Sequence, residues 1–123
     1  MIILRQNNYS EPIYYQDGVM LRYDGNKIDD VEEVLSRKDI KILDKIMKSY
    51  KEDYFNYDKD FLSRRGINKQ NVLKDLKIFE IDIWSSKKFG IMYSIDCSLP
   101  KVSGIITGEY DNLGNNLRWG LND

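Results

Sequence analysis

The spacing of apolar residues changes once along this chain, and the change restricts the folds that the sequence can form. Between Ile40 and Tyr54, apolar residues recur three and four positions apart, which predicts a helix with one buried face. From Ile78 onward they recur at every second position, which predicts strands that bury one face of a sheet. Because the helical pattern precedes a run of strands, we expect a fold of the α+β class.

Two helices are predicted, one long and one short. Residues 36–39 have the order of a helix capping box with aspartate in place of glutamate, and the apolar stripe follows directly. The members of the stripe are Ile40, Leu43, Ile46, Met47, Tyr50 and Tyr54, and lysines occupy the other side of the helix. Asn68 is the expected N-cap of the short helix over residues 69–76. The aromatic and charged segment between the helices, residues 53–66, is interpreted as a loop.

Strands are predicted at both ends of the chain. An N-terminal hairpin is expected over residues 11–23, because two strand-like segments flank the turn signal at residues 16–18. The C-terminal half holds four more predicted strands: residues 78–84, 89–97, 102–110 and 117–121. Short turns join them, so we expect an antiparallel meander, since parallel strands would need long crossovers. The chain is thus predicted to be a single domain, residues 1–123: an N-terminal hairpin, and one long and one short helix packed on a C-terminal four-stranded antiparallel meander.

Composition excludes most familiar enzyme sites. The chain has no histidine, which excludes Ser-His-Asp and Cys-His catalysis together with most zinc, copper and haem sites. Its single cysteine, Cys97, lies on the apolar face of a predicted strand and permits neither an intramolecular disulfide nor a cysteine cluster for zinc. Asp58 and Asp60 do not begin a calcium loop, because Lys69 stands where such a loop needs glutamate. We therefore predict no catalytic residue, no metal and no cofactor.

Carboxylate chemistry is the remaining enzymatic alternative. In the first C-terminal strand, Phe79, Ile81 and Ile83 are predicted to face the core, which places Glu80 and Asp82 together on the opposite face. Two carboxylates at this spacing could serve glycoside hydrolysis. A strand covered by helices on one side normally presents carboxylates to water on the other, and we favour this explanation.

Charge is distributed unevenly along the chain. Residues 37–77 carry a net charge of +5, whereas the segments before and after them carry −4 and −2. Such a bipolar surface favours charge-steered association with another macromolecule. A sequence pI of about 5.5 and the lack of a recognition motif argue against nucleic acid as that partner. No apolar run is long enough to cross a bilayer and no secretory signal is present, so we expect a cytoplasmic protein without membrane contact.

Aromatic residues supply candidate contacts for a protein partner. Nine tyrosines and two tryptophans are many for 123 residues, and both types are favoured at interface hot spots. Tyr54 and Tyr57 fall in the predicted loop, and Trp84 lies opposite the apolar face of its strand. From charge and aromatic content, the predicted partner-binding residues are Asp29, Asp30, Glu32, Glu33, Tyr54, Tyr57, Glu80, Asp82 and Trp84.

The C-terminal sequence also resembles a known family. The segment Phe89-Gly90-Ile91-Met92-Tyr93-Ser94-Ile95-Asp96-Cys97 is followed by Gly104-Ile105-Ile106-Thr107-Gly108-Glu109-Tyr110-Asp111 and by Trp119-Gly120-Leu121-Asn122-Asp123. This pattern resembles the closing sheet of small bacterial immunity proteins from polymorphic-toxin and contact-dependent growth inhibition systems. The resemblance implies a non-enzymatic protein that binds a cognate toxin domain, for example a nuclease, and occludes its active site. The alternative is a regulatory or phage-related interaction module, in one version a homodimer.

Overall fold

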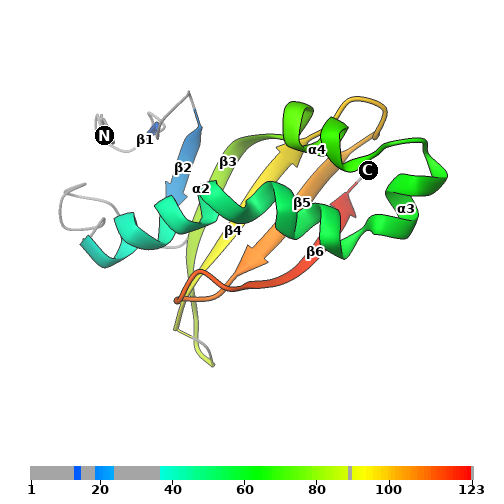
Figure 1. Ribbon diagram of the computed structural model, residues 1–123. Coiled ribbons are helices and arrows are strands. Elements are labelled where there is room, and N and C mark those ends of the chain that lie inside the picture. The colour runs from blue at the N-terminus through cyan, green and yellow to red at the C-terminus, as the bar shows by residue number, and fades with distance from the viewer. Residues whose placement is uncertain (1–12, 15–18, 24–36, 89, 123) are drawn as a thin grey trace.

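Helices precede an antiparallel meander in the structure, as the change in apolar spacing predicts. The computed structural model describes residues 13–14, 19–23, 37–88 and 90–122. Its elements are β1 (Ile13–Tyr14), β2 (Met20–Tyr23), α2 (Arg37–Tyr57), α3 (Lys59–Arg64), α4 (Lys69–Asp75), β3 (Lys77–Ser86), β4 (Gly90–Ser98), β5 (Ile105–Tyr110) and β6 (Asn116–Asn122). The fold is of the α+β class, with the helices laid along one face of the sheet (Figure 1).

The strands form one sheet in which spatial order follows chain order, from β1 to β6. The four strands β3 to β6 pair antiparallel, which confirms the predicted meander. β2 pairs parallel with β3, and the helices form the crossover that this arrangement requires. β1 pairs antiparallel with β2. Residues 11, 12 and 15–18 of the hairpin predicted over residues 11–23 lie outside the described residues, so the hairpin stays a prediction.

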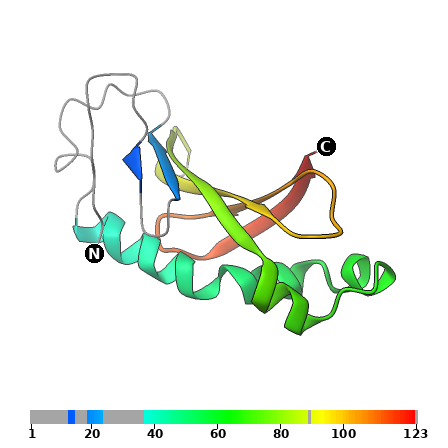
Figure 2. The same cartoon turned by 90° about the horizontal axis from the view of Figure 1, so that it is seen from above.

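The core lies between α2 and the face of the sheet beneath it (Figure 2). Of the predicted apolar stripe of α2, four residues are buried and two, Ile40 and Met47, are half-buried against the core. The strands contribute the residues that alternate toward the helix. The largest side chains in this core are Leu43, Ile46, Tyr54, Ile81, Ile83, Tyr93, Ile95, Ile106 and Tyr110. Removal of this apolar surface from water is the main favourable contribution to folding. Among the described helices, none has both the length and the apolar content of a bilayer-spanning helix.

The segment between the two predicted helices is helical, which corrects the expected loop over residues 53–66. α2 continues to Tyr57, and α3 follows almost at once. Leu62 of α3 is fully buried, and Arg65 places its guanidinium 4.4 Å from the centre of the Phe61 ring. A helix this short forms because tertiary packing stabilises it, and local propensity alone does not reveal such packing. Gly66 follows α3 with a φ of 70°, a conformation that glycine adopts without strain.

The short helix α4 begins as predicted. The side chain of Asn68 accepts a hydrogen bond from the backbone N–H of Asn71 at 2.9 Å, and the Asn71 side chain accepts one from the backbone N–H of Asn68 at 3.0 Å. This reciprocal capping box satisfies backbone donors that the first turn would otherwise leave open. Val72 and Leu76 then turn into the core.

A register shift in β3 corrects one predicted core residue. Between Ile78 and Glu80 the pairing with β4 moves by one position, which leaves Phe79 at the irregularity. Ile78 is therefore buried and Phe79 is 40% exposed, so the prediction that Phe79 faces the core is wrong. Beyond the shift, Ile81 and Ile83 face the core as predicted. Residues of β3 on the two sides of the shift therefore pair with β4 in registers that differ by one position.

Candidate functional site on the outer face of the sheet

The face of the sheet turned away from α2 carries mostly polar side chains. We call it the outer sheet face and define it by the residues that alternate with the buried ones: Glu80, Asp82 and Trp84 of β3, Ser94 and Asp96 of β4, and Thr107 and Glu109 of β5. In the part of the chain that the structure describes, the helices lie on the opposite face (Figure 2). The outer sheet face is therefore the surface of the sheet on which these side chains are not covered by the described helices.

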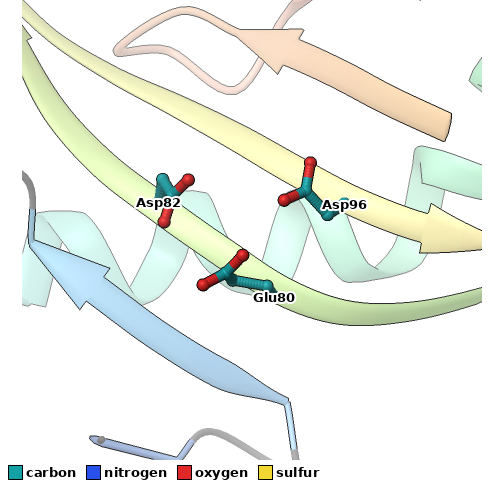
Figure 3. Close-up of side chains that lie close together, drawn as sticks. All are labelled: Glu80, Asp82 and Asp96. Carbon is teal, nitrogen blue, oxygen red and sulfur yellow. The ribbon is translucent and has the colours of Figure 1, made fainter. Parts of the chain in front are cut away.

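Three carboxylates gather at the centre of the outer sheet face. Glu80 pairs across the strands with Asp96, and Asp82 pairs with Ser94. One oxygen from each of Glu80, Asp82 and Asp96 lies within 4.8 Å of the others, and all three residues are half-buried. Figure 3 shows Glu80 and Asp82 on β3 with Asp96 beside them on β4. We call this group the carboxylate cluster.

Strand geometry brings these residues together. Residues two positions apart on a strand share a face, which explains the pair on β3. Antiparallel pairing then brings the side chain directly opposite on β4 to within about 5 Å, which explains the approach of Asp96. The register that aligns Asp96 with Glu80 runs without interruption from the pair Ser86–Gly90 beside the β3–β4 turn, and the shift at Phe79 comes only after it.

Neighbouring polar groups hold the cluster and its surroundings in place. Thr107 on β5 donates a hydrogen bond from Oγ1 to Oδ1 of Asp96 at 2.8 Å. Asn122 on β6 donates in turn to Oγ1 of Thr107 at 3.2 Å. Trp84 donates from Nε1 to Oγ of Ser94 at 2.8 Å, which fixes an aromatic ring on the same face as the carboxylates. The outer sheet face is thus an ordered polar surface that extends across four strands.

Electrostatics give the carboxylate cluster its chemical character. One oxygen of Glu80 and one oxygen of Asp82 are shielded from solvent. Three carboxylates this close together give this part of the outer sheet face a concentrated negative charge. Two kinds of cation suit it: an arginine or lysine from another protein, which would form charge-assisted hydrogen bonds, or a hard divalent metal ion, for which Glu80, Asp82 and Asp96 would be the oxygen ligands.

The predicted partner-binding residues do not lie together in the structure. Glu80, Asp82 and Trp84 lie together on the outer sheet face. Tyr57, at the end of α2, is 54% exposed but belongs to the helical layer. Tyr54 is 1% exposed, which confirms its predicted place in the apolar stripe and shows that the loop interpretation, which put it on the surface, is wrong. The remaining four, Asp29, Asp30, Glu32 and Glu33, lie outside the described residues.

Tyr54 is a core residue because α2 extends past it. Its ring packs edge-on against the indole of Trp119, with ring centroids 5.1 Å apart. Burial is the main reason that the pKa of its phenol is raised above the ordinary value, with the nearby Asp58 adding to the effect. The residue stabilises the contact between helix and sheet.

Sequence reasoning missed Asp96 and Ser94 as members of the outer sheet face. Alternation with Tyr93, Ile95 and Cys97 in the predicted strand does place both residues on the polar face. The missing information is the register of β4 against β3, which determines that Asp96 meets Glu80.

Two other features described by the structure lie apart from this face. A shallow surface hollow of ≈ 550 Å³ lies between α2 and the β5–β6 connection, lined by Lys45, Ser49, Asp53, Asn56, Tyr57, Gly114, Asn115 and Asn116. Cys97 is fully buried in the core, and burial raises the pKa of its thiol above the ordinary value. A buried protonated thiol is inert, as the sequence predicts.

Comparison with known proteins found no protein-family model that matches the chain and no curated protein or solved structure with significant similarity to it. Its function is therefore argued from its own residues.

Proposed function

We propose that this chain is a non-enzymatic protein-binding domain: a cytoplasmic immunity protein that binds a cognate bacterial toxin domain and neutralises it by occluding the active site. The carboxylate cluster is the observation that carries the proposal. It concentrates negative charge on an ordered face next to an aromatic ring. A concentrated negative charge beside an aromatic ring is complementary to a basic protein surface, and such complementarity steers association and sets specificity.

The chemistry of the cluster indicates what the partner presents. A basic patch would pair its arginine or lysine side chains with the carboxylates through charge-assisted hydrogen bonds. A nuclease is one fitting target, because a nuclease active site is built to attract the negative charge of a phosphate backbone. The carboxylate cluster carries negative charge, as the phosphate backbone does, and would be attracted to the same groove. Trp84 adds an aromatic anchor of the type found at interface hot spots.

Neutralising substitutions on the outer sheet face provide the test. The chain is co-expressed with the protein encoded by the neighbouring gene, and cell survival is measured. Wild type should protect the cells, and the triple variant Glu80→Gln, Asp82→Asn, Asp96→Asn should lose protection. A matched control, Glu52→Gln, Asp60→Asn, Asp75→Asn, removes the same charge from the helical layer and should protect like wild type.

Binding kinetics refine the test. If the carboxylates steer association, the association rate with the toxin should fall as salt is added, and it should fall more steeply for wild type than for the triple variant. Equal protection by wild type and the triple variant would show that the outer sheet face does not bind the toxin. The alternative, a regulatory or phage-related interaction module, also needs a binding face but no toxin, so a wild-type chain that protects against nothing would favour it.

A further inference from the structure

The strand β6 forms one edge of the described sheet. It pairs with β5, and no other described strand pairs with it. Natural edge strands usually carry lysine, proline or inward-pointing charge that prevents another chain from pairing with them. β6 has neither lysine nor proline, and its one charge, Arg118, is engaged by Glu109 at 2.8 Å. The edge therefore lacks the usual side chains that block pairing.

Apolar side chains accompany this edge. Leu117 and Leu121 of β6 are 50% and 41% exposed, whereas Trp119 between them is buried. Exposed leucines on an edge strand favour association with another strand, because pairing removes both the leucines and the open backbone groups from water.

The sequence of β6 reads almost the same in both directions. Asn116-Leu117-Arg118-Trp119-Gly120-Leu121-Asn122 places asparagine at both ends, leucine next to each end and tryptophan at the centre. A two-fold symmetric interface requires a surface that is complementary to itself, and antiparallel pairing of a palindromic strand meets this requirement. We propose that β6 pairs antiparallel with β6 of a second copy of this chain, with the two-fold axis at Trp119.

The side chains select this register over its neighbours. With Trp119 opposite Trp119 of the second copy, each Leu117 meets a Leu121 and each Arg118 meets a Gly120. A register centred on Arg118 would place the two arginines directly opposite one another, which is destabilising in a sheet. A register centred on Gly120 would pair Leu121 with Trp119 and leave no leucine pair. Of these three registers, only the one centred on Trp119 pairs leucine with leucine and keeps the two arginines apart.

The centre of β6 is open to this partner, whereas Leu117 lies at a register shift against β5, so its pairing with Leu121 falls at the margin of the interface. The Trp119 ring stays in its own core between Tyr54 and Tyr110, so only its backbone takes part in the pairing. An atom added at the Cβ position of Gly120 has no neighbour within 4 Å, which leaves room for Arg118 of the second copy. The dimer would place two carboxylate clusters on one continuous sheet, an arrangement suited to bivalent binding.

Sedimentation equilibrium over a range of concentrations tests the pairing. A single strand pair buries less surface than a stable obligate dimer, so a weak dimer is expected, with dissociation at about micromolar concentration or above. The variant Leu117→Lys, Leu121→Lys should weaken self-association by at least about tenfold. Leu113→Lys is the matched control, since Leu113 is 61% exposed but lies in the β5–β6 connection. A wild type that stays monomeric at millimolar concentration, or a dimer that the paired lysines leave unchanged, overturns the proposal.

Cysteine cross-linking tests the register independently. Cα pairing of Arg118 with Gly120 brings their Cβ atoms to about 5 Å, whereas two Arg118 positions are about 7 Å apart on the diagonal. A mixture of Arg118→Cys and Gly120→Cys chains should therefore oxidise to a mixed dimer faster than either chain alone. The buried Cys97 should not react. Fastest cross-linking of Arg118→Cys with itself would exclude the register centred on Trp119.

Discussion

The phenol of Tyr110 on β5 donates a hydrogen bond to Oδ2 of Asp53 on α2 at 2.7 Å. Tyr93 on β4 makes the corresponding bond to Oδ1 of Asp39 at 2.5 Å, near the other end of the helix. Each bond joins a tyrosine of the sheet to a carboxylate of the helix, so α2 is fixed at both ends. Burial, and then the bond to Asp53, raises the pKa of Tyr110 above its ordinary value.

Removing the hydroxyl of Tyr110 should test how much this contact contributes. Tyr110→Phe keeps the buried ring but loses the charge-assisted hydrogen bond, so we expect the free energy of unfolding to fall by about 1.5 kcal/mol. Urea denaturation at neutral pH measures the change. Tyr57→Phe is the control, because Tyr57 is exposed at the end of the same helix. An equal effect of the two substitutions would show that the bond to Asp53 contributes nothing measurable.

A matched pair of glycines tests the packing between β5 and β6. A Cβ atom added to Gly108 would lie 2.7 Å from the Trp119 ring, so Gly108→Ala should lower the free energy of unfolding by about 1–3 kcal/mol. Gly120 has open space, and Gly120→Ala should raise it by about 0.5 kcal/mol, because alanine loses less backbone entropy on folding. Thermal unfolding of both variants should shift the midpoint in opposite directions, and a shift in the same direction would contradict the packing.

The parts of the fold that the sequence predicts are those with a long, regular apolar period. The stripe from Ile40 to Tyr54 covers several helical turns, so the period is unambiguous and the helix is found. α3 has only six residues, too few to show a period, and its stability comes from the burial of Leu62. The stripe includes Tyr54, and only the interpretation of residues 53–66 as a loop put this residue on the surface.

The sequence predicts only part of the candidate site. Alternation places Glu80, Asp82 and Trp84 on one face, because side chains on a strand alternate strictly. It does not place Asp96 beside them. Residues of odd number face the core on both β3 and β4, so several registers that differ by two positions satisfy the same pattern. The pairing of Ser86 with Gly90 at the turn selects one of them, and this pairing is a property of the backbone.

The loop after β5 should give the stability of the protein a dependence on pH. Burial would raise the pKa of Asp111, but the backbone N–H groups of Asn115 and Leu113, each 2.9 Å from Oδ1, outweigh it, so the pKa lies below the ordinary 3.8. A lowered carboxyl pKa means that the ionised form stabilises the fold at higher pH and that this stabilisation disappears as pH falls through the folded-state pKa.

Asp111→Asn should reveal this contribution. The variant should lose about 0.5 kcal/mol at neutral pH, since solvent screens the loop. The difference from wild type should shrink as pH falls below about 3.8 toward the folded-state pKa. Urea unfolding at a series of pH values measures it, with Asp60→Asn on the exposed side of α3 as the control. A difference that stays constant, or grows, with falling pH would contradict the assigned hydrogen bonds.

Neutralising one member of the carboxylate cluster should stabilise the free protein. Asp96→Asn keeps an oxygen that can accept the hydrogen bond from Thr107 and removes one of three close negative charges. We expect a gain of about 0.5–1 kcal/mol in the free energy of unfolding at low salt, and a smaller gain at high salt because ions screen the repulsion. Chemical denaturation at two salt concentrations measures both values. Loss of stability would instead show that the charge of Asp96 is already compensated in the fold.

The parallel pairing of β2 with β3 affects the order in which the chain can fold. Residues 24–76 separate the two strands, whereas β3 to β6 each pair with the next strand along the chain. Contacts between distant segments form later than local ones, because closing the intervening loop costs entropy first. During synthesis at about 5–20 residues per second, β2 would leave the ribosome about 3–13 s before β3 is complete. During this interval β2 lacks its partner from the C-terminal half, and a chaperone that shields it would raise the yield of folded protein.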